Sequence, residues 1–88
     1  MDKRVRCSKF ISWQIEPNLE FVYIFNHKNS QWIYLDGISK IIWEKLMTSS
    51  IREVCKEIMQ EFDVEEDVVS EDILELVDSL VEEGVLEI

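Results

Sequence analysis

The strongest constraint on the fold is a pair of apolar runs separated by a short polar segment. Phe21–Phe25 consists only of β-branched and aromatic residues, and Trp32–Leu35 departs from this only at its Leu. Such residues favour strands, and the polar residues 26–30 between the two runs are suited to a hairpin loop. The two runs therefore predict an antiparallel β-hairpin.

A third strand is predicted upstream of this hairpin. Phe10–Ile15 alternates irregularly between apolar and polar residues and is followed by Glu16-Pro17-Asn18. Proline lacks a backbone N–H and has a fixed φ, so the strand should end there. We expect the first part of the chain to form a sheet of three short antiparallel strands.

After Asp36-Gly37 the apolar residues recur at helical spacing. A first helix is expected to reach about Met47, and Ser50 with Glu53 has the spacing of a capping box at the start of a second. A third should begin near Glu65–Asp67 and end at Gly84, which can adopt the left-handed conformation. The expected apolar stripes are Ile38, Ile41, Ile42 and Leu46 in the first helix, with Trp43 beside them; Ile51, Val54, Cys55, Ile58 and Phe62 in the second; and Val69, Ile73, Leu76, Val77, Leu80 and Val81 in the third.

The last residues, Val85–Ile88, either return as a short strand or simply cover the core. Composition agrees with a globular chain, because 47% of the 88 residues are hydrophobic and only three are Gly or Pro. We expect residues 1–88 to form a single domain of the α+β class.

Charge is distributed very unevenly along the chain. Residues 1–60 hold 7 acidic and 9 basic side chains, a balance of +2, whereas residues 61–88 hold 12 acidic side chains and no Lys, Arg or His. The acidic segment repels phosphate backbones, which argues against nucleic-acid binding by the third helix. A winged-helix DNA-binding regulator stays an alternative, although Arg52 and Lys56 are the only basic residues of the expected second helix.

No motif for catalysis, metal binding or cofactor binding is present in the sequence. His27 is the one histidine and lies in the expected hairpin loop, and Cys7 and Cys55 have no metal-ligand spacing. Gly37 and Gly84 are too far apart for a phosphate-binding loop. We therefore expect no catalytic residue, metal or cofactor. No export signal or membrane span is recognisable, so a cytoplasmic protein is expected.

The expected hairpin leaves an edge strand rich in aromatic residues. Because side chains alternate in a strand, Trp32 and Tyr34 point to one face while Ile33 and Leu35 point to the other. The aromatic residues of the hairpin are either core-facing and cross-strand residues of the sheet, or partly exposed, because one of these two pairs is hard to bury unless both faces are covered. An exposed aromatic edge would suit an added peptide strand. The acidic face of the third helix is open to two interpretations, a solvated surface or an attraction for a basic peptide; its residues include Glu71, Glu75, Asp78 and Glu82.

The segment Tyr23–Leu46 resembles the PqqD-like family, in particular through the run Ile42-Trp43-Glu44-Lys45-Leu46. The aromatic Phe62 before an acidic segment and the closing Leu80–Leu86, with its Leu-x-x-x-Gly-x-Leu pattern, belong to the same resemblance, which covers about residues 18–88. It implies a winged-helix-like fold, with a three-stranded antiparallel sheet followed by three helices.

The resemblance further implies a peptide-binding module that captures the leader segment of a ribosomally made precursor peptide. The leader would be added as a strand between the third strand and the third helix. Mapped onto this chain, the candidate peptide-binding residues are Gln31, Trp32, Ile33, Tyr34 and Leu35 of the strand, and Asp72, Glu75, Leu76, Ser79 and Leu80 of the helix.

A module of this size would leave the chemistry to a partner. The resemblance implies a separate modifying enzyme, such as a radical S-adenosylmethionine protein, a cyclodehydratase or a leader peptidase. A third class stays open beside the peptide chaperone and the DNA-binding regulator, namely a small dimeric scaffold subunit. A homodimer formed through the same strand edge would compete with the peptide.

Overall fold

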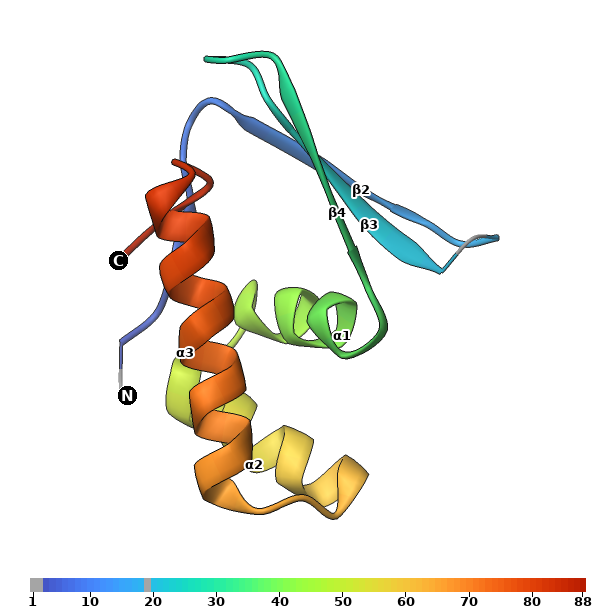
Figure 1. Ribbon diagram of the computed structural model, residues 1–88, viewed down its shortest axis with the longest axis vertical. Helices are drawn as coiled ribbons and strands as arrows, with labels where there is room; N and C mark the ends of the chain where they lie inside the picture. The colour runs from blue at the N-terminus through green and yellow to red at the C-terminus, as the bar shows by residue number, and fades with distance from the viewer. Residues whose placement is uncertain (1–2, 19) are drawn as a thin grey trace.

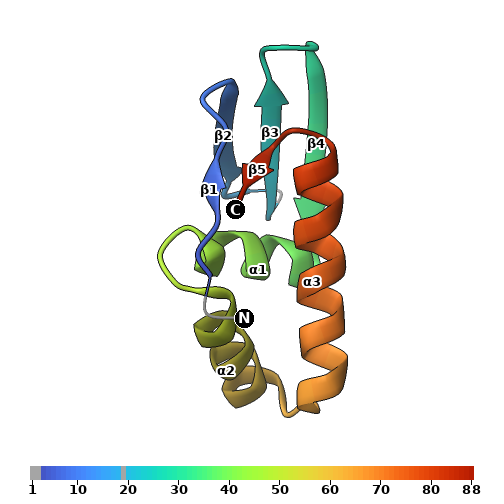
Figure 2. The ribbon, with the colours of Figure 1, turned by 90° about the vertical axis from the view of Figure 1, so that its left-hand side faces the viewer.

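The computed structural model describes residues 3–18 and 20–88. A three-stranded sheet packs on a layer of three helices, mainly through the first of them (Figure 1). A second, two-stranded sheet joins segments near the two ends of the chain (Figure 2). The elements in chain order are β1 (Arg6–Cys7), β2 (Ile11–Glu16), β3 (Phe21–Asn26), β4 (Gln31–Asp36), α1 (Gly37–Leu46), α2 (Ile51–Phe62), α3 (Glu66–Glu82) and β5 (Leu86–Glu87). The expected α+β fold, with three antiparallel strands followed by three helices, is confirmed.

The main sheet has the order β2-β3-β4, and both pairings are antiparallel. Its inner face, which packs on the helices, carries Val22 and Ile24, both fully buried. Phe21, Tyr23 and Phe25 alternate with them and lie on the outer face, where they are half-buried. Along β3, the strand period of two therefore separates aliphatic side chains on the inner face from aromatic side chains on the outer face.

The two-stranded sheet pairs the beginning of the chain with its end. Arg6 lies opposite Glu87 and Cys7 opposite Leu86, and the Ser8 amide donates to the Val85 carbonyl over 3.0 Å. The short-strand alternative for the C-terminal tail is thus confirmed. β1 was not predicted, because two residues are too few to carry a strand period.

The helix boundaries follow local capping chemistry. At the start of α2 the Glu53 amide donates to the Ser50 hydroxyl and the Ser50 amide to the Glu53 carboxylate, which confirms the capping box. Gly84, just beyond α3, has a φ of 78° and accommodates the left-handed turn that ends the helix. α1 starts directly after β4, at Gly37.

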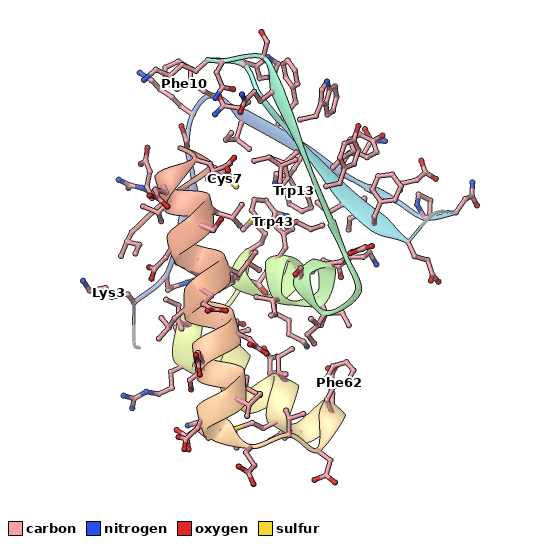
Figure 3. The ribbon with its side chains drawn as sticks, in the orientation of Figure 1. Lys3, Cys7, Phe10, Trp13, Trp43 and Phe62 are labelled. Atoms are coloured by element: carbon pink, nitrogen blue, oxygen red, sulfur yellow. The ribbon has the colours of Figure 1, made fainter. Side chains whose placement is uncertain are left out.

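The core lies between the sheet and the helices and is centred on Trp43, which is fully buried. Its ring meets Trp13 of β2 edge to face, with centroids 5.6 Å apart, and Figure 3 shows the two side chains between the sheet and α1. Ile38, Phe62 and Val81 were expected in the apolar stripes, but each is exposed at the surface. The helices therefore keep part of their apolar surface uncovered.

Candidate functional site

The outer edge of β4 is unpaired. β4 bonds to β3 on one side only, and no strand among the described residues pairs with its other side. In both ribbon views α3 stands beside this edge (Figures 1 and 2). Alternate residues of an antiparallel edge strand direct their N–H and C=O groups outward, so β4 presents unmatched donors and acceptors beside the helix.

The side chains of β4 divide between the two faces of the sheet. Trp32 and Tyr34 lie on the outer face and are 54% and 63% exposed. They belong to an aromatic cluster in which Trp32 meets Phe25 at 4.6 Å and Tyr34 meets Phe21 at 5.5 Å between ring centroids. Alternation along the strand leaves open which pair is exposed, and the structure shows that it is Trp32 and Tyr34.

The inward-facing positions of β4 contribute to the core instead of to an open surface. Leu35 is 7% exposed, and Ile33 packs against the core from a half-buried position. Gln31 is exposed at the loop end of the strand. What β4 offers beside α3 is therefore mainly its backbone.

On α3, the five candidate residues differ in accessibility. Asp72, Glu75 and Ser79 are exposed, Leu76 is half-buried, and Leu80 is 3% exposed within the core. Leu80 is therefore the least accessible of the five candidates.

Three of the candidates converge on a hollow between α1 and α3, which we call the acidic hollow. Its volume is about 430 Å³, and it is lined by Ile38, Ser39, Ile42, Asp72, Glu75 and Leu76. Asp72 and Glu75 supply carboxylates, while Ile38, Ile42 and Leu76 supply apolar surface. Ser79 does not line this hollow.

A second hollow, the apolar hollow, adjoins the first and was not predicted. It measures about 230 Å³ and is lined by Ile38, Ile42, Ile58, Phe62, Val64, Val68, Val69 and Asp72. Helical periodicity predicts Ile38 and Phe62 in apolar stripes, because a period identifies the apolar face of a helix but not what covers that face. One feature of the sequence could have indicated this hollow: the apolar residues at 62, 64 and 68 continue beyond the apolar stripe of either helix.

Two basic side chains of α1, the helix that lines both hollows, are paired with carboxylates. Lys40 lies 3.2 Å from the Glu44 carboxylate, and Lys45 donates to Glu61 over 2.9 Å. The hydrogen bond to Glu61 raises the pKa of Lys45. No ion pair joins Asp72 or Glu75 to a basic residue within the part of the chain that the structure describes.

Groups that could perform chemistry are not arranged for it. The His27 ring lies 2.8 Å from the Ser12 hydroxyl and packs edge-on against Phe25. His27 follows β3 at the hairpin loop, whereas both hollows adjoin α1, which follows the other end of β4. Burial raises the pKa of the Cys7 thiol, which disfavours a nucleophilic thiolate. Among residues 3–18 and 20–88, no group of His, Cys, Asp and Glu side chains could hold a metal ion. None of the helices described combines the length and apolar character needed to cross a bilayer.

An open strand edge beside an acidic helix, on a small α+β scaffold, is suited to the addition of a peptide strand. The chain belongs to the PqqD family: the family model described as "Coenzyme PQQ synthesis protein D (PqqD)" matches residues 22–86. The family resemblance drawn from the sequence is confirmed.

Two solved structures share the fold. One, "TbiB1 in Complex with the TbiA(beta) Leader Peptide", is 19% identical, with a TM-score of 0.86 over 93% of this chain and 94% of that chain. The other, "Lasso peptide synthetase B1 complexed with the leader peptide", is 22% identical, with a TM-score of 0.87 over 98% of this chain and all of that chain. A comparison with curated protein sequences found no match.

Proposed function

We propose that this chain, acting over residues 1–88 as a single non-catalytic domain, binds the leader segment of a ribosomally made precursor peptide. The leader adds as a strand to the free edge of β4, between β4 and α3. The observation that carries the proposal is the unpaired β4 edge standing beside the acidic hollow. Both solved relatives of the same fold are complexes with a leader peptide, which supports this assignment.

Strand addition divides peptide binding between backbone groups and side chains of the candidate site. The β4 backbone supplies hydrogen bonds that need no particular peptide sequence, and α3 and α1 supply the side chains that select among peptides. The bound leader is then delivered in the cytoplasm to a separate modifying enzyme, such as a radical S-adenosylmethionine protein, a cyclodehydratase or a leader peptidase.

Hydrogen exchange tests the strand addition directly. A displayed library of random peptides is enriched on the immobilised chain, and the strongest binder is synthesised and added to the ¹⁵N-labelled protein. Amide protons of alternate residues in Gln31–Asp36 should exchange more slowly in the complex, because an added strand accepts hydrogen bonds from them. Binding that leaves every β4 amide unprotected would refute the proposal.

The DNA-binding alternative gains no support from the site, because α3 carries no basic residue. Sedimentation of the same protein, with and without peptide, distinguishes a homodimer formed through the β4 edge from a monomer that binds the peptide there. A dimer that uses this edge would protect the β4 amides before any peptide is added, and peptide binding would dissociate it.

A further inference from the structure

Four exposed apolar side chains gather at one place on the helical layer. Ile38 of α1, Phe62 at the end of α2, Val64 in the following turn and Val68 of α3 are all more than one-third exposed, and all line the apolar hollow. Figure 3 shows Phe62 at the end of the molecule remote from the hairpin loop. Exposed apolar groups gathered around a hollow, here of about 230 Å³, are typical of an interaction surface.

This hollow continues the path of a peptide bound at β4. The acidic and apolar hollows share Ile38, Ile42 and Asp72, so the two are contiguous. β4 ends at Asp36 and α1 starts at the next residue, which places Ile38 just beyond the end of the strand. In Figure 1, α3 continues well past this end of β4 towards α2. A peptide strand that leaves the β4 edge at Asp36 therefore reaches the acidic hollow and then the apolar one.

Charge limits what can occupy this path. Asp72 and Glu75 form one wall of the acidic hollow. The segment that leads into α3 is also acidic in sequence, with Asp63, Glu65 and Asp67, and residues 61–88 contain no Lys, Arg or His. An acidic peptide would be repelled, whereas a Lys or Arg side chain would find carboxylates that have no ion-pair partner in the described chain.

We infer that the peptide's recognition sequence pairs a large apolar side chain, seated in the apolar hollow, with a neighbouring Lys or Arg that contacts Asp72 and Glu75. The inference rests on the proposed function, since the peptide must first be held along β4. It names the chemistry that selects the leader: an apolar residue with a cation beside it, placed just beyond the segment that pairs with β4. The strand edge supplies general affinity, and this anchor supplies selectivity.

A displayed random library tests the anchor. Peptides enriched on the chain should share an aliphatic or aromatic residue with Lys or Arg close to it in sequence. Val68→Asp fills the hollow with a charge and should weaken the strongest binder roughly 10- to 100-fold, as expected for the loss of one buried apolar side chain. Val68 is exposed and lies in the first helical turn, where an acidic residue is tolerated, so the variant should fold.

Matched substitutions on α3 separate the anchor from general effects. Leu74→Asp makes a similar change at an exposed position that lines neither hollow, and it should leave affinity within about twofold of the parent. Asp72→Lys should weaken binding and remove the preference for Lys and Arg from a second round of enrichment. Asp78→Lys, an equal change in charge on the same helix away from both hollows, should do neither.

The outcomes distinguish this inference from the proposed function. Protection of β4 amides by a peptide whose affinity is unchanged in both Val68→Asp and Asp72→Lys would overturn the anchor and leave strand addition intact. Absence of β4 protection would overturn both. A concentration-dependent dimer that disappears in Val68→Asp would assign the apolar hollow to a second copy of the chain, and would also overturn the anchor.

Discussion

The two faces of the sheet are both apolar, yet only one is covered. On the inner face, Val22 and Ile24 are fully buried against the helices, whereas on the outer face Trp32 and Tyr34 remain more than half exposed. The inner face is largely aliphatic and packs against α1; the outer face is aromatic and packs only on itself. Apolar side chains therefore stabilise the fold on the inner face of the sheet and form accessible surface on its outer face.

The largest test of this contrast is a change beneath the inner face. Trp43→Ala removes a fully buried ring and should lower the free energy of unfolding by about 3–5 kcal/mol, measured by urea denaturation. Trp43→Phe should cost much less, because the indole N–H has no hydrogen-bond partner among the described residues and its loss leaves no acceptor unmatched. Equal costs for the two variants would contradict this reading of the core.

A smaller loss of stability is expected from removing the capping box at the N-terminus of α2, in the helical layer. Ser50→Ala removes the hydroxyl that accepts from the Glu53 amide and should cost about 1 kcal/mol. Thr48→Ala, at an exposed position just before the cap, serves as the control and should cost less. A cost no greater than that of the control would mean that the capping box contributes little to α2.

The same capping box makes part of the stability depend on pH. The backbone hydrogen bond from Ser50, and then its side-chain hydrogen bond, lower the pKa of the Glu53 carboxyl below its usual value. A lowered folded-state pKa gives stability that is present above the unfolded-state pKa and is lost as the pH falls through the folded-state value. In urea titrations, the difference in stability between the parent and Glu53→Gln should therefore shrink on acidification; a constant difference would contradict the assignment.

The smallest effect is expected on the outer face. Trp32→Thr keeps a residue that favours strands but removes the ring contacts with Phe25 and Tyr23, and should cost about 1 kcal/mol or less. Tyr34→Thr should behave similarly. If either variant lost as much stability as Trp43→Ala, the outer face would be part of the core and the contrast between the two faces would be wrong.

The sequence was sufficient for the elements whose pattern is local. The strand runs around Val22 and Leu35, the capping box at Ser50 and the turn at Gly84 each rest on a few neighbouring residues, and each was placed to within about a residue. β1 escaped prediction because its pairing with β5 joins residues from opposite ends of the chain. Long-range pairing of two-residue strands leaves no periodic trace.

The candidate site was predictable in its backbone and less so in its side chains. The free edge of β4 follows from the order of three strands, but the apolar hollow depends on how α1, α2 and α3 cross. Periodicity placed Phe62 in an apolar stripe, yet its side chain is 42% exposed, and the family resemblance placed Leu80 in the groove, yet its side chain is 3% exposed. Tertiary packing decides which part of an apolar helix face is covered by the other helices, and helical periodicity in the sequence does not specify that packing.

The open edge of β4 also bears on how the chain avoids aggregation. An exposed strand edge invites pairing with the same edge of another copy, which is a common start of fibrous assembly. Two copies meeting at β4 would bring together two α3 helices from segments that each hold 12 acidic residues and no base. Like charges on the two helices should oppose such pairing, and added salt should weaken this repulsion.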